Sequence, residues 1–321
     1  FDFKSFYIVL EDLGDGSYDL TSPDMLSLGG LIRELRIEQK LSQTILCYGL
    51  CSKSKLSKIE NNILQPEIAL AEALLQRLGI NDNAFTFLGN KHESELSSLQ
   101  QALRKTKYSD YNLVKNLLHS MEKVLTPKDT LYYQYFLYKN TNYLENCEEI
   151  ITQLNTALSL TLPNFNINEI LNYRLSWLEL TILNNLSAAY CDGPSPSLGI
   201  QYFYKILEYI STNNIDIFLS SKISGITTAM LFRRLYRFNR FSEMIEVLPM
   251  ITSINPCIAA DICSLANIYA HFSQALGECK HYNKVITIAK YSIGCYKLYE
   301  NEKLITNLCQ FIHEDFNIDI Y

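Results

Sequence analysis

The sequence predicts an all-α protein in which a small domain of short helices precedes a long array of helix pairs. Apolar residues recur at helical spacing along most of the chain, and 48% of its 321 residues are hydrophobic, so a large buried core is expected. The breaks between the expected helices are short and rich in Asn, Gly and Pro, which are turn residues. Beyond residue 109 no strand pattern competes with the helical one.

Residues 41–60 contain the clearest helical signal, which is two short helices with a tight turn between them. Ser42 suits the N-cap of the first helix and Ser52 that of the second, because a serine hydroxyl accepts a hydrogen bond from an unpaired N–H of the first turn. The helical spacing of the first helix continues to Tyr48 or Gly49, and the turn is expected directly after it.

The second of these helices presents a surface suited to DNA. Leu56 and Ile59 are expected to face inward, which leaves small and basic side chains outside. Lysine ammonium groups neutralise phosphates, and a helix fits the major groove, which is about 12 Å wide. A solvated basic face on an ordinary helical hairpin is the alternative. The outward set consists of Lys53, Ser54, Lys55, Ser57 and Lys58.

The flanking residues extend this pair into a domain of four to five short helices over residues 26–80. An amphipathic segment at residues 28–36 precedes the pair. Pro66 suits the first position of a later helix, and Gly79 suits the C-terminal cap of that helix. A basic second element in the helical pair is therefore set within a compact helical domain.

One set of residues in this domain matches a known pattern, and it consists of Leu41-Ser42-Gln43, Leu46, Ser57-Lys58-Ile59-Glu60-Asn61, Pro66 and Leu78-Gly79-Ile80. It resembles the helix-turn-helix domain of the Cro/C1 repressor class. The resemblance implies a five-helix domain that binds double-stranded DNA, with its third helix reading bases. The residues that it assigns to DNA contact are Gln43, Ser52, Lys53, Ser54, Lys55 and Lys58.

The turn between the two helices departs from many members of that class. Those members have a glycine and one more residue in the turn, where this chain has Leu50-Cys51-Ser52. The shorter, cysteine-containing turn resembles the PlcR branch of peptide-responsive regulators.

Charge is distributed unevenly along the chain, whose formal net charge is −6. Residues 26–80 carry seven basic and five acidic side chains, whereas residues 1–25 carry one and six and residues 81–321 carry 20 and 23. The positive excess thus lies in the predicted DNA-binding domain, as expected for a contact with phosphates. Because the excess is small, one copy is expected to bind weakly, and we expect a homodimer.

Sequence motifs for membranes, metals and catalysis are missing. No apolar run approaches 18 residues and no secretory signal pattern occurs at the start, so we expect a cytoplasmic protein without membrane contact. The nine cysteines are scattered without a C-x-x-C pair, which favours structural thiols in a reducing compartment. No Walker loop, G-x-S-x-G, G-x-G-x-x-G or H-E-x-x-H sequence occurs, so no catalytic residues, cofactor or metal site are expected.

Two segments flank the DNA-binding domain. Residues 1–25 are an extension of uncertain origin, and their alternating pattern predicts a hairpin, or a strand and a loop, over residues 1–24. This extension is either an added segment or an acidic arm native to the protein. Residues 81–108 are predicted to be a linker whose residues 91–105 form a connecting helix.

Residues 109–321 are predicted to form a solenoid of helix pairs. Three second helices have similar openings at Ser197, Phe241 and Tyr282, and their starts are 44 and 41 residues apart. They resemble degenerate tetratricopeptide repeats, and an irregular helical bundle is the alternative. Helices are expected over residues 110–125, 146–162, 168–191, 195–213, 216–238, 240–254, 257–279, 282–299 and 302–316, with a further helix after Asp129.

A solenoid has a concave surface that suits an extended peptide. Asparagine side chains can satisfy a peptide N–H and C=O together, so polar residues on the first helix of each pair are candidates for peptide binding. Each of them also has a structural alternative, as a cap, a bridge between helices or a core residue. The candidates are Asn172, Tyr173, Trp177, Asn184, Asn185, Arg233, Asn267 and Tyr269, with His271 beside them.

The two domains together resemble the peptide pheromone-sensing regulators that include Rgg, PlcR, NprR and PrgX. The resemblance implies a right-handed repeat solenoid, a homodimer, and quorum sensing through a short peptide that alters the dimer arrangement. A constitutive DNA-binding regulator whose repeat array serves dimerisation and protein docking is the alternative. An enzyme would require a cluster of acids or metal ligands, which the sequence does not show.

Overall fold

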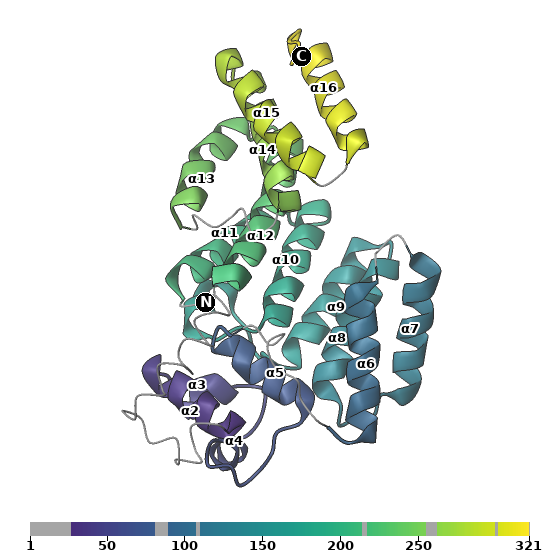
Figure 1. Ribbon diagram of the computed structural model, residues 1–321, viewed down its shortest axis with the longest axis vertical. Coiled ribbons are helices and arrows are strands. Elements are labelled where there is room, and N and C mark those ends of the chain that lie inside the picture. The colour runs from purple at the N-terminus through teal and green to yellow at the C-terminus, as the bar shows by residue number, and fades with distance from the viewer. Residues whose placement is uncertain are drawn as a thin grey trace, which may run out of the picture. The chain divides into compact units, whose positions relative to one another are not determined.

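The computed structural model describes residues 27–80, 89–106, 110–213, 217–254, 262–298 and 301–320. All regular secondary structure in these ranges is helical (Figure 1), so the all-α prediction is confirmed. The chain divides into two compact units, residues 1–186 and residues 187–321. The hairpin predicted for residues 1–24 lies outside the described residues. No helix in the described ranges combines the length and the apolar character that a membrane span needs.

The first unit begins with a cluster of short helices around its own hydrophobic core. Residues 27–80 contain four of the five helices predicted for this domain, and their core includes Ile32, Leu46, Leu56 and Leu74. The Ser42 hydroxyl accepts a hydrogen bond from Ile45 N at 3.2 Å and the Ser52 hydroxyl one from Lys55 N at 3.1 Å, so both predicted caps are confirmed. The four helices are α2 (Leu28–Glu38), α3 (Gln43–Cys47), α4 (Lys53–Glu60) and α5 (Ile68–Arg77).

The turn between α3 and α4 is longer than predicted. Helix α3 ends at Cys47, so the expectation that it continues to Tyr48 or Gly49 is wrong. Gly49 has a φ of 67°, a left-handed conformation that glycine adopts without steric cost. The turn therefore does contain a glycine. Gly49 lies one residue before Leu50-Cys51-Ser52, the segment predicted to form the turn.

The rest of the first unit is a series of packed helices. Helix α6 spans the predicted residues 91–105, and Asn90 and Glu93 form a capping box at its start. Helix α6 packs on α7, and α8 packs on α9. The elements are α6 (Lys91–Lys105), α7 (Tyr111–Val124), α8 (Thr130–Asn140), the short 3₁₀ helices η3 (Thr141–Tyr143) and η4 (Ile167–Asn172), α9 (Cys147–Ser159), and α10 (Trp177–Asp192), which continues into the second unit.

The single helix predicted over residues 168–191 is wrong. The structure has η4, then an extended break, and α10 starts only at Trp177. The Ser176 hydroxyl accepts a hydrogen bond from Glu179 N at 3.3 Å, and Glu179 Oε2 accepts one from Ser176 N at 2.6 Å. This reciprocal pair is a capping box, which fixes the start of α10 at this position.

The second unit consists of paired helices, as predicted for the repeat array. Helices α13 and α15 begin at the predicted residues Phe241 and Tyr282. Two residues before each start, Asn239 and Lys280 have a positive φ. The N–H of the next residue bonds back into the preceding helix, which is a Schellman cap. The elements are α11 (Pro196–Thr212), α12 (Ile217–Arg237), α13 (Phe241–Ile254), α14 (Ile262–Glu278), α15 (Tyr282–Leu298) and α16 (Glu302–Phe316).

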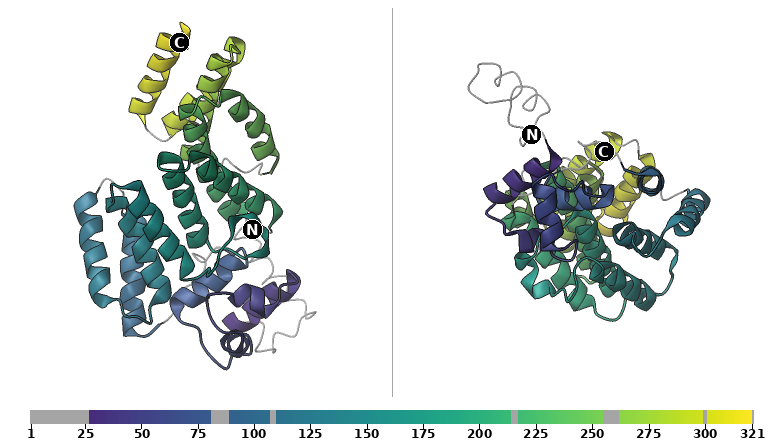
Figure 2. Two further views of the ribbon diagram at one scale, coloured as in Figure 1. Left: turned by 180° about the vertical axis from the view of Figure 1, so that it is seen from behind. Right: turned by 90° about the horizontal axis from the view of Figure 1, so that it is seen from below.

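Helices of the second unit pack on the next helix in the chain or on the one after it. Helix α12 packs on α11 and α14, and α15 packs on α14 and α16. Figures 1 and 2 both show α15 and α16 side by side near the C-terminus. The predicted breaks at Asn214 and at Asn255-Pro256 lie outside the described residues, as does the start of the helix expected from residue 257.

Candidate nucleic-acid interface and repeat-domain cavity

The outer face of α4 carries small and basic side chains. Ser52, Lys53, Ser54 and Lys58 are exposed, and Lys55 is half-buried. The opposite face holds Leu56 and Ile59, which are 0% and 1% exposed and so fix the helix on the core. A helix of this kind presents ammonium groups and short hydroxyl side chains on a surface without bulky apolar groups.

A buried carboxylate at the end of α4 holds this helix on α2. Glu60 is 3% exposed, and its Oε1 and Oε2 accept hydrogen bonds from Arg36 Nε at 2.6 Å and Arg36 Nη2 at 2.8 Å. The hydrogen bond with Glu60 raises the pKa of Arg36, against the opposing effect of burial. Gly29 of α2 allows the two backbones to touch, since a Cβ there would lie 1.9 Å from the Ile59 carbonyl oxygen.

Gln43 also binds this carboxylate. Its Nε2 donates to Glu60 Oε2 at 2.7 Å, which links the first residue of α3 to the last residue of α4. One N–H of the Gln43 side chain is therefore engaged within the protein. A direct DNA contact by Gln43 stays a prediction, and it would use the second N–H or the amide oxygen.

Lys55 is paired with an acidic residue outside α4. Its Nζ lies 2.8 Å and 2.7 Å from the two carboxylate oxygens of Glu67. Burial is the largest single effect and raises the pKa of Glu67, but the hydrogen bonds from Lys55, a backbone hydrogen bond and the charge of Lys55 together lower it. The charge on Lys55 is thus partly neutralised, and the positive potential of this face comes mainly from Lys53 and Lys58.

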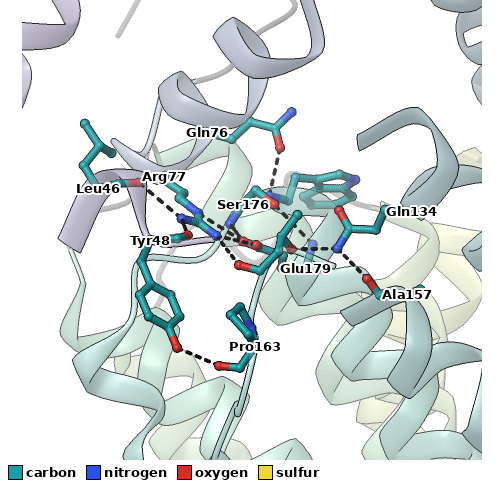
Figure 3. Close-up of polar contacts among 11 residues, drawn as sticks. Leu46, Tyr48, Gln76, Arg77, Gln134, Ala157, Pro163, Ser176 and Glu179 are labelled. Carbon is teal, nitrogen blue, oxygen red and sulfur yellow. Dashed lines mark hydrogen bonds and ion pairs between the residues drawn. The ribbon is translucent and has the colours of Figure 1, made fainter. Parts of the chain in front are cut away.

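A second buried ion pair joins α5 to the start of α10 (Figure 3). The side chains of Arg77 and Glu179 are both 0% exposed, and Arg77 Nη2 lies 2.6 Å from Glu179 Oε1. Arg77 also donates to the carbonyl oxygens of Leu46, Tyr48 and Thr161. Arg77 Nε donates to Glu179 Oε2 at 3.4 Å, so every donor direction of the guanidinium is used, as a buried charge requires.

Neighbouring contacts in the first unit strengthen this junction. The backbone N–H of Trp177 donates to Gln76 Oε1 at 3.0 Å, and the Tyr48 hydroxyl donates to the Pro163 carbonyl oxygen at 2.6 Å. The helix-turn-helix turn, the end of α5 and the start of α10 are thus bound to one another. Sequence reasoning missed Arg77 and Glu179, although the spacing Ser176-x-x-Glu179 is a capping-box signature that marks a helix start.

Five of the predicted peptide-binding residues lie in the first unit. Asn172 is exposed at the end of η4, and the Tyr173 ring packs against Phe165 and Tyr48 with centroids 5.0 Å and 5.9 Å apart. Trp177 begins α10. Asn185 Nδ2 donates to the Thr181 carbonyl oxygen at 2.9 Å, which bridges one turn of α10.

Asn184 differs from the other four. It is 3% exposed, and its Oδ1 accepts no hydrogen bond from any described residue. A buried amide oxygen that accepts no hydrogen bond is energetically costly. A hydrogen bond to it from a ligand N–H or from a water molecule would therefore be favourable.

The other three predicted residues lie in the second unit, where α12, α14, α15 and α16 line a cavity of about 670 Å³. Arg233 and Asn267 line it, whereas Tyr269 does not and packs instead beside Tyr291, with ring centroids 5.9 Å apart. The polar residues of the cavity wall are Arg233, Arg234, Asn267, His271, Gln274, Tyr296 and Asn307.

Among solved structures, PlcR of Bacillus thuringiensis, crystallised with the peptide PapR7 and DNA, matches this chain with a TM-score of 0.54. The match has 16% sequence identity and covers 88% of this chain and 98% of that one. The chain has the fold of PlcR. The competence regulator ComR of Streptococcus vestibularis, in complex with its signalling peptide XIP, matches with a TM-score of 0.44 and 15% identity over 90% of this chain and 98% of ComR.

Neither the family models nor the curated proteins contain a match to this sequence. The similarity to PlcR therefore concerns the fold, and it agrees with the prediction of a helix-turn-helix domain followed by helical repeats. Within the described residues, no group of three or more His, Cys, Asp or Glu side chains is arranged to hold a metal ion.

Proposed function

We propose that this protein is a sequence-specific DNA-binding transcription regulator, and not an enzyme, whose helical repeats bind a short signalling peptide. The observation that carries the proposal is α4, a capped helix with exposed Lys53 and Lys58 that the Arg36–Glu60 pair holds in place. It occurs in a chain with the fold of PlcR, which was crystallised with a peptide and DNA.

In this proposal α4 enters the major groove. Lys53 and Lys58 neutralise phosphates, while Ser52 and Ser54 allow the backbone to approach the groove wall. Gln43 and Lys55 contribute less, because Glu60 and Glu67 already bind them. Two copies are needed to place two α4 helices on half-sites about 34–36 Å apart, so the working form is a homodimer in the cytoplasm, where the DNA is.

The peptide acts by changing the populations of two dimer arrangements. A ligand shifts such an equilibrium only by binding one arrangement better than the other. Residues 26–80 would bind DNA, residues 81–108 would link the parts, and residues 109–321 would bind peptide and dimerise. Among the eight candidate peptide contacts, the buried oxygen of Asn184 and the cavity residues Arg233 and Asn267 have the best-supported chemistry.

The test is the salt dependence of DNA binding by the full chain. Replacing Lys53 and Lys58 with Ala removes two phosphate contacts, so affinity for every duplex should fall by at least about tenfold and the slope of log K against log salt should flatten by about 1.8 per chain. Binding is measured by fluorescence anisotropy with unrelated duplexes across a salt series.

The matched control replaces Lys115 and Lys123, two exposed lysines of α7. It changes the net charge equally and should leave the salt slope unchanged. An equal effect of both double variants, or no effect of either, would contradict the assignment of α4 as the helix that meets DNA.

A further inference from the structure

The cavity of the second unit is lined by two arginines and by apolar side chains. Arg233 and Arg234 of α12 line it, and the described lining residues include no carboxylate. Met230, Leu308 and Phe311 supply apolar surface. Its volume of about 670 Å³ lies within the range of about 300–1,000 Å³ typical of small-ligand sites. It is therefore suited to one end of a peptide and not to its whole extended length.

The arginines of this cavity are only partly neutralised. Asp192 binds both Arg234, at 2.8 Å, and Arg237, at 2.7 Å, so one carboxylate serves two guanidinium groups. Arg234 Nε is buried and has no hydrogen-bond partner among the described residues. Arg233 is exposed, and no ion pair joins it to another residue in the described parts of the chain. The two guanidinium groups thus line a cavity whose described lining includes no carboxylate.

The lining residues of α14 and α15 contribute neutral polar groups. The Tyr296 hydroxyl donates to Asn267 Oδ1 at 2.8 Å, and His271 Nδ1 lies 3.1 Å from Gln274 Oε1. Since an amide oxygen only accepts, His271 Nδ1 carries the proton. Burial, and to a lesser degree the charge of Arg233, lowers the pKa of His271 despite the bond to Gln274, so the ring is neutral at pH 7. The positive charge of the cavity therefore comes from guanidinium groups alone.

We propose that this cavity binds the carboxyl-terminal residue of the peptide, with its free carboxylate at Arg233 and Arg234. An apolar last side chain lies against Met230, Leu308 and Phe311. The inference rests on the proposed peptide-binding function and adds which end of the peptide is recognised and by what chemistry. An exposed arginine alone is expected to bind a peptide with a free carboxylate a few-fold more tightly than the same peptide as an amide. A buried N–H without a partner beside it raises this ratio to about tenfold.

The test uses the full chain and a pool of short synthetic peptides, each made as a free acid and as an amide. Half of the peptides end in Leu or Phe and half in Ser or Lys. Retained peptides are separated by rapid gel filtration and quantified by mass spectrometry. Free acids with an apolar last residue should be enriched about tenfold over their amides. Arg233→Gln should lose most of this preference, and Arg233→Lys should keep part of it because the charge remains.

Lys222→Gln is the control, since Lys222 is an exposed cation of the same helix that does not line the cavity. It should keep the full preference. N-acetyl-leucine and N-acetyl-phenylalanine test whether a small carboxylate alone suffices, and they should be retained far less than peptides. Equal retention of acids and amides, an unchanged preference in Arg233→Gln, or equal retention of the N-acetyl amino acids would overturn the inference. Retention of no peptide in any form would instead contradict the peptide-binding function itself.

Discussion

Glu179→Gln is expected to lower the free energy of unfolding of the first unit by about 3–5 kcal/mol, because it leaves the Arg77 guanidinium buried without its counter-charge. Glutamine has nearly the same shape as glutamate, so the loss of stability would come from the lost charge and not from a change in volume. Urea unfolding of the full chain, followed by circular dichroism, measures it.

The control is Glu145→Gln, a change of the same chemistry at an exposed residue of the same unit, which should alter stability by less than about 0.5 kcal/mol. The double variant Arg77→Met with Glu179→Leu should recover part of the loss, since no buried charge remains. If Glu179→Gln were as harmless as the control, the buried pair would not hold α5 on α10.

Gly49→Ala is expected to destabilise the same unit by about 2–5 kcal/mol. A left-handed φ costs a non-glycine residue about 1–2 kcal/mol, and forcing an atom into a packed site costs about 1–3 more. The added Cβ would lie 2.0 Å from the Thr161 carbonyl oxygen, which accepts a hydrogen bond from Arg77. Differential scanning calorimetry should show a lowered transition temperature.

Gly294→Ala provides the contrast, because a Cβ at this exposed position of α15 would meet no atom within 4 Å. Alanine has a higher helix propensity than glycine, so this variant should be slightly more stable than the unmodified protein. A loss of stability at Gly294 equal to that at Gly49 would show that the effect is not caused by the turn.

Local signals in the sequence predicted the elements well. The Ser42 and Ser52 hydroxyls each accept a hydrogen bond from the N–H three residues later, so these caps depend only on local sequence. Helices such as α16 (Glu302–Phe316) follow from apolar periodicity between turn residues. The predicted helix over residues 168–191 failed because its apolar spacing continues across a break that the Ser176–Glu179 capping box imposes. That signal was present in the sequence, but it competed with a longer periodic pattern.

The candidate site was predictable only where it depends on one helix. The exposed face of α4 follows from its periodicity, whereas the partners of Gln43, Lys55 and Arg77 lie 17, 12 and 102 residues away. No short-range pattern specifies such pairs, because they depend on how separate helices pack. For the same reason the sequence singled out Arg233 and Asn267 but did not predict the cavity that they share.

The most direct test of the account is whether peptide changes DNA affinity. The preferred duplex is first selected from a random pool with the full chain, and its affinity is then measured by anisotropy with and without a retained peptide at about 100 times its Kd. We expect a change of at least about tenfold, which corresponds to a coupling free energy of about 1.4 kcal/mol. An unchanged affinity at saturating peptide would contradict peptide gating and favour a constitutive regulator whose repeats serve as a docking scaffold.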